Sequence, residues 1–413
     1  MRRRILLGTV LLLILLAAAG AALAAEAENI TGRCSIKVCS SSRGPSLMTD
    51  GKYTSYWESN KIRQPYVTIS SETPMYGLYL CFRAMPSSFE IQELRETAEE
   101  TREWVTLTPG DTRFHHTFYP LDGASWIRII STQEGYHRLG FNEIFVFGQG
   151  DIPDWVQRWE EPEEKADILF FSAHPDDELI FLGGAIPTYA AEREKRVVVA
   201  YLSYSNTTRR SEALNGLWSM GVRHYPEFGG FRDAYSKKAK DAYHTLGKDK
   251  VLGWVTGLYR KHRPEVVVTH DINGEYGHGQ HRMMADAAIQ GYELAADPAK
   301  YPESAAQYGT WQAKKLYVHL YGDEDIQTRF DWNVPLEKLG GKTGLEAASE
   351  AYALHKTQES AEVKINGKWT PLSVEVTGSA YPNTVFGLYA SEVGPDETHT
   401  DFLEHIGTEE AGE

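Results

Sequence analysis

Residues 173–178, Ala-His-Pro-Asp-Asp-Glu, place one imidazole and three carboxylates in six consecutive positions. They follow an apolar run at 168–171 that is too short for a helix and is flanked by charge, which predicts a buried parallel strand. Side chains just beyond the carboxyl end of such a strand project into the binding crevice of an open α/β sheet. Adjacent carboxylates repel unless a cation or donor holds them, so Asp176 and Asp177 favour a metal site over simple packing.

His174 and Asp177 can both reach one divalent ion if the turn curls back, with Asp176 facing the ion's water. Zinc in a hydrolase usually keeps three protein ligands and one open position, so a third ligand must come from elsewhere. The best candidate is the segment Gly-Glu-Tyr-Gly-His-Gly-Gln-His. There His278 and His281 lie three apart at the start of a helical pattern. The two segments together predict the site.

The combined pattern, Ala-His-Pro-Asp-Asp-Glu after a strand and a later Gly-x-Tyr-Gly-His-x-x-His, resembles the zinc-dependent LmbE-like family. This family is also called the N-acetylglucosaminyl-phosphatidylinositol de-N-acetylase (PIG-L) family. The resemblance covers residues 165–405 and implies a Rossmann-like fold and hydrolysis of the N-acetyl group of an amino sugar. The family's second motif commonly reads His-Pro-Asp-His, whereas Gly279 and Gln280 separate the histidines here. The spacing is kept, so we expect ligation to survive.

A mechanism can be built from the residues. Zinc lowers the pKa of a bound water towards about 7 and polarises the amide carbonyl, while Asp176 takes the water proton as general base. His278, spared from ligation if His281 is the ligand, suits stabilisation of the oxyanion, protonation of the leaving amine, or both. The family pattern implies the same roles: His174, Asp177 and His281 as metal ligands, Asp176 as base and His278 as acid. Fe²⁺ is compatible with the same ligand set.

Four further residues match the family less closely, as substrate-binding positions. Tyr276 lies where the family's tyrosine contacts the intermediate, and Arg209 aligns with an Arg-x-x-Glu that holds substrate hydroxyls or phosphate. Asp233 falls where a sugar-contacting aspartate is common, and His355 resembles a late His-x-x-Gln that borders the site. The alternatives are a solvated ion pair for the arginine, a turn cap for the aspartate and a helix-surface position for His355.

The chain opens with Met-Arg-Arg-Arg, a leucine-rich apolar run and a small-residue end, which predicts a secretory signal peptide over residues 1–25. The alternative is an uncleaved membrane anchor, because the run is nearly long enough to span a bilayer. Either way we expect the remaining chain to be secreted or at the cell surface. Removal of the three arginines takes the formal charge from −15 to −18, which argues against nucleic acid or anionic lipid as a partner.

The three cysteines are Cys34, Cys39 and Cys81. A disulfide between two of them and three free thiols are equally compatible with the sequence. None of them accompanies the metal motifs.

Residues 29–150 carry many short β-like runs separated by turns, among them 66–70, 76–82, 126–130 and 144–147, which predicts an all-β sandwich. A charged connector at 151–165 separates this domain from the predicted deacetylase domain at 166–405, and a tail follows at 406–413.

The segment 48–57, with 126–129 and 142–144, resembles a discoidin-type jelly roll of the coagulation-factor C-domain kind. Domains of that kind often bind carbohydrate on loops at one end. By this analogy Tyr53, Tyr56 and Trp57 form a sugar platform; the alternative places the tryptophan in the core.

The second domain alternates strands and helices. Helices are predicted over 179–194, 209–220, 250–262 and 282–294, and strands over 196–202 and 266–269. This order predicts an α/β, Rossmann-like fold with a mostly parallel sheet and helices on both faces.

The sequence therefore predicts an exported, zinc-dependent deacetylase of an N-acetylglucosamine-type glycan or glycoconjugate. One alternative is a zinc amidase acting on a non-sugar acyl amide. Another is a carbohydrate-binding surface protein with a dormant hydrolase domain. The oligomeric state is not predicted.

Overall fold

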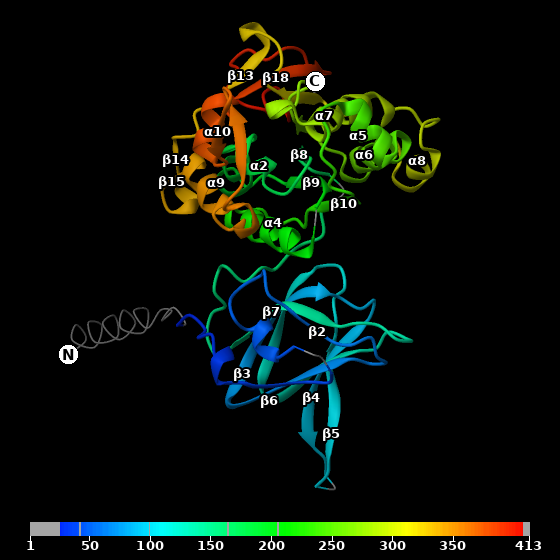
Figure 1. Ribbon diagram of the computed structural model, residues 1–413, viewed down its shortest axis with the longest axis vertical. Helices are drawn as coiled ribbons and strands as arrows, with labels where there is room; N and C mark the ends of the chain where they lie inside the picture. Colours follow the sequence, from blue (N-terminus) through cyan, green and yellow to red (C-terminus); the bar gives the residue numbers. More distant parts are fainter. Residues whose placement is uncertain (1–24, 41–42, 99, 163–164, 205, 408–413) are drawn as a thin grey trace, which may run out of the picture. The chain divides into compact units, whose positions relative to one another are not determined.

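The computed structural model describes residues 25–40, 43–98, 100–162, 165–204 and 206–407. These residues form two compact units (Figure 1). The first runs to Arg113 and includes Thr117–Gln157, and the second comprises Phe114–His116 and the chain from Arg158 onward. The predicted signal peptide, apart from its last residue, and most of the predicted tail lie outside the described residues.

The first unit is an all-β domain whose seven strands form one antiparallel sheet. Its strand order is β2-β7-β3-β6-β4-β5, with β1 paired to β3. The strands are β1 (Ser35–Val38), β2 (Trp57–Glu58), β3 (Tyr66–Ala84), β4 (Phe89–Glu96), β5 (Arg102–Pro109), β6 (His116–Ser131) and β7 (Gly140–Phe147). Two short 3₁₀ turns accompany them, η1 (Thr31–Arg33) and η2 (Pro45–Met48). The predicted jelly-roll class is confirmed.

The long strand β3 explains how one sheet encloses a core. Its first part pairs with β1 and its last part with β7, yet Val67 and Ile69 pack in the same hydrophobic cluster as Leu78 and Leu80. Because side chains from both ends of this strand pack in one core, the sheet must fold over on itself. The prediction of two separate strands here is wrong, because the 19 residues of β3 run on without a break.

The predicted sugar platform is not formed as expected. Trp57 is fully buried and stacks on Phe141 with ring centroids 6.5 Å apart, because the pairing of β2 with β7 turns it into the core. Tyr56 is covered by Arg83, whose guanidinium carbon lies 3.8 Å from the ring centroid. Tyr53 is half-buried. The prediction of a platform that includes Trp57 is therefore wrong.

The second unit is built on a seven-stranded, mostly parallel sheet in the order β10-β9-β8-β11-β12-β18-β13. The first five strands pair in parallel, and β18 and β13 add antiparallel strands at one edge. These strands are β8 (Ile168–Ser172), β9 (Val197–Ser203), β10 (Glu227–Phe231), β11 (Val266–Thr269), β12 (Lys315–His319), β13 (Gln327–Arg329) and β18 (Val385–Ser391). The predicted fold class is confirmed.

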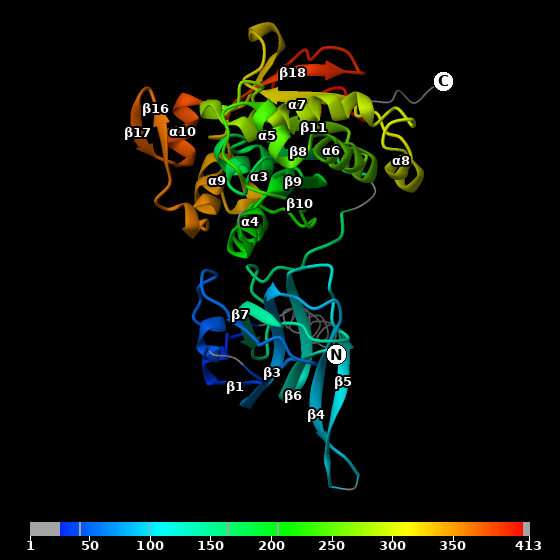
Figure 2. The ribbon, with the colours of Figure 1, turned by 45° about the vertical axis from the view of Figure 1, so that its right-hand side comes forward.

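Two small hairpin sheets pair β14 with β15 and β16 with β17. Their strands are β14 (Pro335–Leu336), β15 (Lys342–Thr343), β16 (Glu362–Ile365) and β17 (Lys368–Pro371). Figure 2 shows the β16–β17 hairpin beside α10.

Helices cover both faces of the large sheet. The described helices are α2 (Asp177–Ile180), α3 (Ala185–Pro187), α4 (Thr207–Ser219), α5 (Ala239–Leu246), α6 (Lys248–His262), α7 (Gly279–Leu294), α8 (Pro302–Tyr308), α9 (Gly344–Tyr352) and α10 (Val374–Ala380). Short turns are η3 (Thr188–Glu192, π-helical) and the 3₁₀ turns η4 (Glu275–Gly277), η5 (Glu324–Ile326), η6 (Glu337–Leu339) and η7 (Lys356–Gln358). Alternate strand residues serve the two faces: Phe170 packs in the cluster with α4 and α9, and Phe171 in the cluster with α6 and α7.

The predicted helix over 179–194 is wrong, because the structure breaks it into α2, α3 and η3. The break falls at Gly183, which adopts φ +54°, and Gly184, where a Cβ would meet the Trp332 ring at 2.7 Å. Glycine is needed at both positions for conformation and for close approach. The predictions over 209–220, 250–262 and 282–294 match α4, α6 and α7 to within a few residues.

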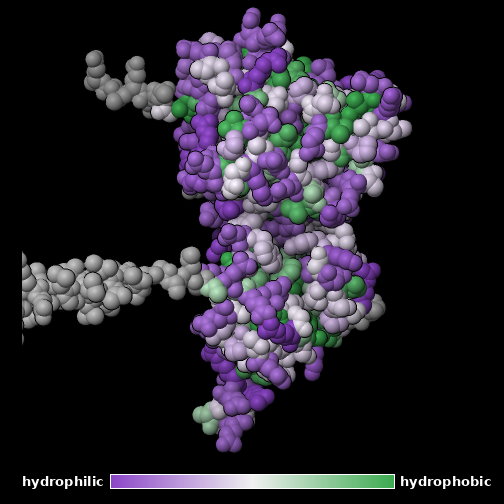
Figure 3. Space-filling view, turned by 90° about the vertical axis from the view of Figure 1, so that its left-hand side faces the viewer, coloured by the Kyte–Doolittle hydropathy of each residue, from purple (hydrophilic) through white to green (hydrophobic). Residues whose placement is uncertain are grey.

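None of the helices in the described part of the chain is long and apolar enough to cross a membrane. On the face shown in Figure 3, hydrophilic residues dominate and apolar residues are scattered.

Candidate metal centre and active site

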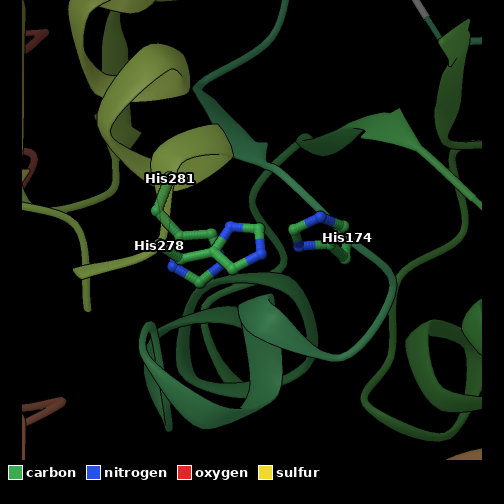
Figure 4. Close-up of side chains that lie close together, drawn as sticks. All are labelled: His174, His278 and His281. Carbon is green, nitrogen blue, oxygen red and sulfur yellow. The ribbon is translucent and has the colours of Figure 1, made fainter. Parts of the chain in front are cut away.

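The sheet order places the two chemical motifs next to each other. β8 and β11 are neighbours, and the chain order reverses between them, since β9 and β10 extend to one side and β12 to the other. Ligands bind at such switch points, beyond the carboxyl ends of the strands. The loop after β8 carries His174, and the segment after β11 carries His278 and His281. The three imidazoles lie together (Figure 4).

Two histidine nitrogens approach one carboxylate oxygen at this point. His174 Nδ1 lies 2.9 Å from Asp177 Oδ2, and His281 Nε2 lies 3.2 Å from the same oxygen. Ligand atoms held about 2.0–2.1 Å from a tetrahedral zinc are separated from each other by about 3.3 Å. The spacing in the structure is close to that value, and all three side chains are buried. The geometry therefore fits a metal ion.

A hydrogen bond selects the nitrogen of His174 that faces the ion. The Gln280 side-chain nitrogen donates to the Arg232 carbonyl at 3.1 Å, which fixes the amide orientation. Gln280 Oε1 must then accept from His174 Nε2, 2.8 Å away. His174 Nδ1 is left without a proton and points towards Asp177. Gln280, which departs from the family pattern, therefore orients the proposed metal ligand His174.

His281 supplies the strongest indication of a metal site. Its Nε2 is buried and has no hydrogen-bond partner, while its Nδ1 hydrogen-bonds to Glu275 Oε2 at 2.8 Å. Buried polar atoms almost always have a partner, and a nitrogen beside the Asp177 carboxylate suits a cation. The residues present therefore fit a divalent metal.

Two other donor sets are less suitable. In the set of Asp177, His270 and His281, the Nε2 of His270 already accepts from the Ala173 backbone N–H at 2.9 Å. In the set that includes His278, one nitrogen of that residue, Nδ1, accepts from the Gln280 backbone N–H at 3.3 Å. In the predicted set of His174, Asp177 and His281 the two nitrogens that face Asp177 carry no backbone donor, and Asp177 Oδ2 accepts from the His174 backbone N–H at 2.8 Å.

A buried carboxylate behind the ligands holds several histidines, and the sequence did not identify this role. Glu275 accepts from His281 Nδ1, from His270 Nδ1 at 2.9 Å and from His319 Nδ1 at 2.7 Å. It also accepts from the Asp271 backbone N–H at 3.1 Å. A carboxylate behind a ligating imidazole fixes the ring orientation and raises its basicity. The available signal was the position of His270 and His319 at or directly beyond the ends of β11 and β12.

The charges around the ligands favour a cation. Burial alone would raise the pKa of Asp177, but His281 and His174 lower it well below its ordinary value. Burial alone would lower the pKa of His281, but Asp177 and Glu275 raise it to about 10. Two carboxylates therefore attract positive charge to this imidazole, and a metal ion that displaces its proton supplies that charge.

Asp176 sits next to the ligands in a strained conformation. Its φ of 120° is rare for a residue with a side chain. The buried Glu178 accepts the Asp176 backbone N–H at 2.9 Å and so holds the turn. Burial raises the pKa of Asp176 to about 6, with Arg209 opposing the shift. A carboxyl group with a pKa near neutrality suits proton transfer.

Arg209 is tied to this carboxylate. Its guanidinium donates to Asp176 Oδ1 at 2.7 Å and to the Pro175 carbonyl. Both contacts orient Asp176 directly. The position of Arg209 at the cavity is the one observation that bears on its predicted role in substrate binding.

His278 is held in one tautomer. Its side chain caps α7 because Nδ1 accepts the Gln280 N–H, so Nε2 carries the proton. Burial and the neighbouring His281 and His174 lower its pKa to about 3. A neutral imidazole N–H is a donor for an oxyanion rather than a source of a proton.

A cavity of about 420 Å³ opens over these residues. His174, Asp176, Asp177 and His278 line it, whereas His281 does not. Of the four residues predicted to bind substrate, Arg209, Asp233 and Tyr276 line it. His355 is not among the lining residues. It is buried and stacks on Tyr352, because it packs beneath α4 and α9, so this placement does not support its predicted role.

The chain resembles known proteins in this region. Residues 169–292 match the PIG-L family, described as GlcNAc-PI de-N-acetylase. A 1D-myo-inositol 2-acetamido-2-deoxy-α-D-glucopyranoside deacetylase of Catenulispora acidiphila is 32% identical over 178 residues, 36% of this chain and 54% of that protein. The deacetylase of the same description from Streptomyces avermitilis is 27% identical, over 58% of this chain and 97% of that protein. The chain thus spans about half the length of the first relative and nearly all of the second.

Among solved structures, N,N'-diacetylchitobiose deacetylase from Pyrococcus horikoshii matches with a TM-score of 0.35 and 19% identity, over 49% of this chain and 74% of that one. Chitosan-binding module 1 from a Paenibacillus sp. IK-5 chitosanase/glucanase matches with a TM-score of 0.26 and 19% identity, over 29% and 99%. The resemblance of the second unit to the PIG-L family, first drawn from its two motifs, is confirmed for residues 169–292.

Proposed function

We propose that the second unit is a metal-dependent N-deacetylase that hydrolyses the acetamide of an N-acetylglucosamine-type sugar in a glycan or glycoconjugate. The observation that carries the proposal is the buried Nε2 of His281, which has no hydrogen-bond partner and lies 3.2 Å from Asp177, a residue that lines the same cavity as Asp176. The relatives named as deacetylases of an N-acetylated glucosaminide support the sugar class.

A divalent metal held by His174, Asp177 and His281 would polarise the amide carbonyl and activate a water. Zinc suits the two nitrogens and one oxygen, and Fe²⁺ fits the same set. Because metal ligation requires unprotonated imidazoles and an ionised carboxylate, the bound ion displaces the protons that these groups carry without it.

Asp176 accepts the proton of the attacking water. The contact with Arg209 and the buried support from Glu178 hold its carboxylate at the cavity. As the carbon–nitrogen bond breaks, the same carboxyl group can give this proton to the departing nitrogen. Acetic acid and a neutral amine result, and at neutral pH a proton moves from the acid to the amine, so that the products are acetate and an ammonium group.

His278 donates its Nε2–H to the oxyanion of the tetrahedral intermediate. This refines the expectation from the sequence, in which His278 also served as the acid. Its low pKa leaves Asp176 as the better carrier of the proton.

Export is part of the proposal and rests on the arginine and leucine pattern of residues 1–25. A protein outside the cell meets polymeric and surface glycans, which suits a glycan substrate. Fractionation of cells that express the tagged chain tests this point, and full retention in the cytoplasm would contradict it.

The test of the activity is acetate release by the purified protein from a panel of N-acetylglucosamine glycosides, with zinc and with a chelator. We expect release that the chelator abolishes and zinc restores. Release that is insensitive to the chelator, or no release from metal-loaded protein with any sugar, would contradict the proposal.

Substitution of the two neighbouring aspartates, one at a time, tests the roles of general base and metal ligand separately. Asp176→Asn should retain bound metal and lose about 10²–10⁴-fold in kcat, whereas Asp177→Asn should lose both metal and activity. Metal content by elemental analysis distinguishes the two. If Asp176→Asn also lost its metal, the assignment of base and ligand would be wrong.

A further inference from the structure

The two most exposed aromatic side chains in the described part of the chain face the same cavity. Tyr235 is 70% exposed and Trp369 is 67% exposed. Both line the cavity that contains Asp176 and His278. A single exposed apolar side chain needs no explanation, but two large rings from separate segments at one catalytic cavity do.

Trp369 lies on a hairpin that the catalytic motifs do not include. In the β16–β17 hairpin it pairs across the strands with Lys364, and both side chains are exposed and line the cavity. Val363, the residue before Lys364, is buried and also lines the cavity. Strand β16 also packs against η4, the turn that carries Tyr276, and the hairpin residues line the same cavity as Asp176 and His278.

Tyr235 lies on the catalytic side of the cavity. Its ring centroid is 5.3 Å from that of His278. The lining therefore has two parts. One consists of the charged and imidazole groups with Tyr235, and the other consists of the hairpin with Trp369 and Lys364.

Trp369 is 67% exposed and lines the cavity, so its ring is available to a ligand there. A pyranose ring has an apolar face of C–H groups and a polar edge of hydroxyls. An aromatic ring covers the apolar face and buries its area, and charged neighbours form hydrogen bonds with the hydroxyls at the edge. Lys364 and Glu362 supply such groups beside Trp369.

A single N-acetylated sugar over the metal ligands needs only the charged part of the cavity. It would leave the exposed tryptophan in water. A second sugar linked to the first would reach the hairpin, cover Trp369 and place its hydroxyls near Lys364. The arrangement therefore favours a chain of sugars over a single sugar.

We propose that Trp369 and Lys364 form a subsite for the sugar next to the one that is deacetylated, so that the substrate is an oligosaccharide or polysaccharide of N-acetylated hexosamine. This inference rests on the proposed deacetylase function and names its substrate class. Tyr235 lines the passage between the two sugars.

The experiment compares chain lengths. Acetate release from N-acetylglucosamine and from its β-linked oligomers of two, three and four sugars gives kcat/KM for each length. We expect kcat/KM to rise about tenfold or more from one sugar to the longer chains. In Trp369→Ala this preference for longer chains should fall about tenfold, mainly through KM, and Trp369→Phe should restore most of it.

Tyr389→Ala is the matched control. Tyr389 is an exposed aromatic of the same unit, 40% exposed, and does not line the cavity. It should keep the full preference for longer chains. Equal kcat/KM for all lengths in the unmodified protein, or an unchanged preference in Trp369→Ala, would overturn the inference.

A binding measurement separates failure of the inference from failure of the proposed function. Titration calorimetry of the four-sugar oligomer against the full chain needs no turnover. If no sugar released acetate, the deacetylase function would fall. Binding that weakens about tenfold in Trp369→Ala would still support the subsite, and equal binding by both proteins, or binding by neither, would overturn it.

Discussion

Replacement of Glu275 by glutamine tests whether the buried carboxylate behind His281 sets the affinity for metal. In the structure Glu275 Oε2 accepts from His270 and His281, and Oε1 accepts from His319 and the Asp271 backbone. A glutamine side chain offers one oxygen and one NH₂ group. Whichever way the amide turns, two N–H donors lose their acceptor.

The expected losses follow from these contacts. Removal of the group that orients a ligating histidine typically lowers metal affinity by about 10–100-fold, which is about 1.4–2.7 kcal/mol. Two buried donors without acceptors cost about 1–3 kcal/mol each, so the metal-free protein should lose about 2–6 kcal/mol before any rearrangement. Burial raises the pKa of Glu275, but the histidines lower it well below its ordinary value, so a full negative charge is removed as well.

The assay is competition for Zn²⁺ against a chromophoric chelator, with unfolding by urea followed for the metal-free protein. Both measurements are made on the full chain. Activity is not needed for either.

Glu227→Gln is the control. Glu227 accepts from His262 Nε2 at 2.9 Å and from Lys261 at 2.6 Å, in the same unit but away from the cavity. It should lower stability and leave metal affinity unchanged. If Glu275→Gln bound Zn²⁺ within about twofold of the unmodified protein, the reasoning would be refuted.

Two further predictions concern acid stability and the thiols. Burial and the nearby Arg209 lower the pKa of His355 to about 3, whereas an unfolded histidine titrates near about 6.5. The unfolded state therefore binds more protons between these values, and this contribution to stability is lost as pH falls below about 6.5, by up to about 1.4 kcal/mol per pH unit. Urea unfolding between pH 7 and pH 4 should show a shallower loss in His355→Phe than in the unmodified protein, and equal slopes would contradict the prediction. The structure has Cys34, Cys39 and Cys81 as free thiols, with Cys81 buried. A thiol reagent should label Cys34 and Cys39 slowly in the folded protein and Cys81 only after unfolding, whereas a mass shift of two hydrogens for a disulfide would contradict it.

The sequence predicts much of the second unit because its signals are local. Three valines and Thr269 match β11 residue for residue, since a strand buried on both faces reads as a nearly unbroken apolar run. The helix expected over 179–194 fails because tertiary contacts decide there. Only the packing of Trp332 against Gly184 shows why the helix must break.

The same distinction applies to the site. His174, Asp177 and His281 are recognisable because two short motifs carry them. Glu275 lies inside one motif, but its role depends on His319, which arrives from β12. No spacing in the sequence predicts that convergence. His355 illustrates the opposite case, since a residue that reads as helix surface is buried in the structure.

The central position of β8 and β11 has a consequence for how the protein folds. Two of the three proposed metal ligands, His174 and Asp177, follow β8 and the third, His281, follows β11, and β9, β10 and several helices lie between them in the chain. The unfolded chain therefore has no preformed chelate, and a high-affinity site exists only after this non-local strand pair has formed. Metal then stabilises the native state by mass action, so the midpoint of unfolding should depend on the free metal concentration. A bound ion would therefore stabilise the sheet after its strands have paired, and it would also take part in the chemistry of the site.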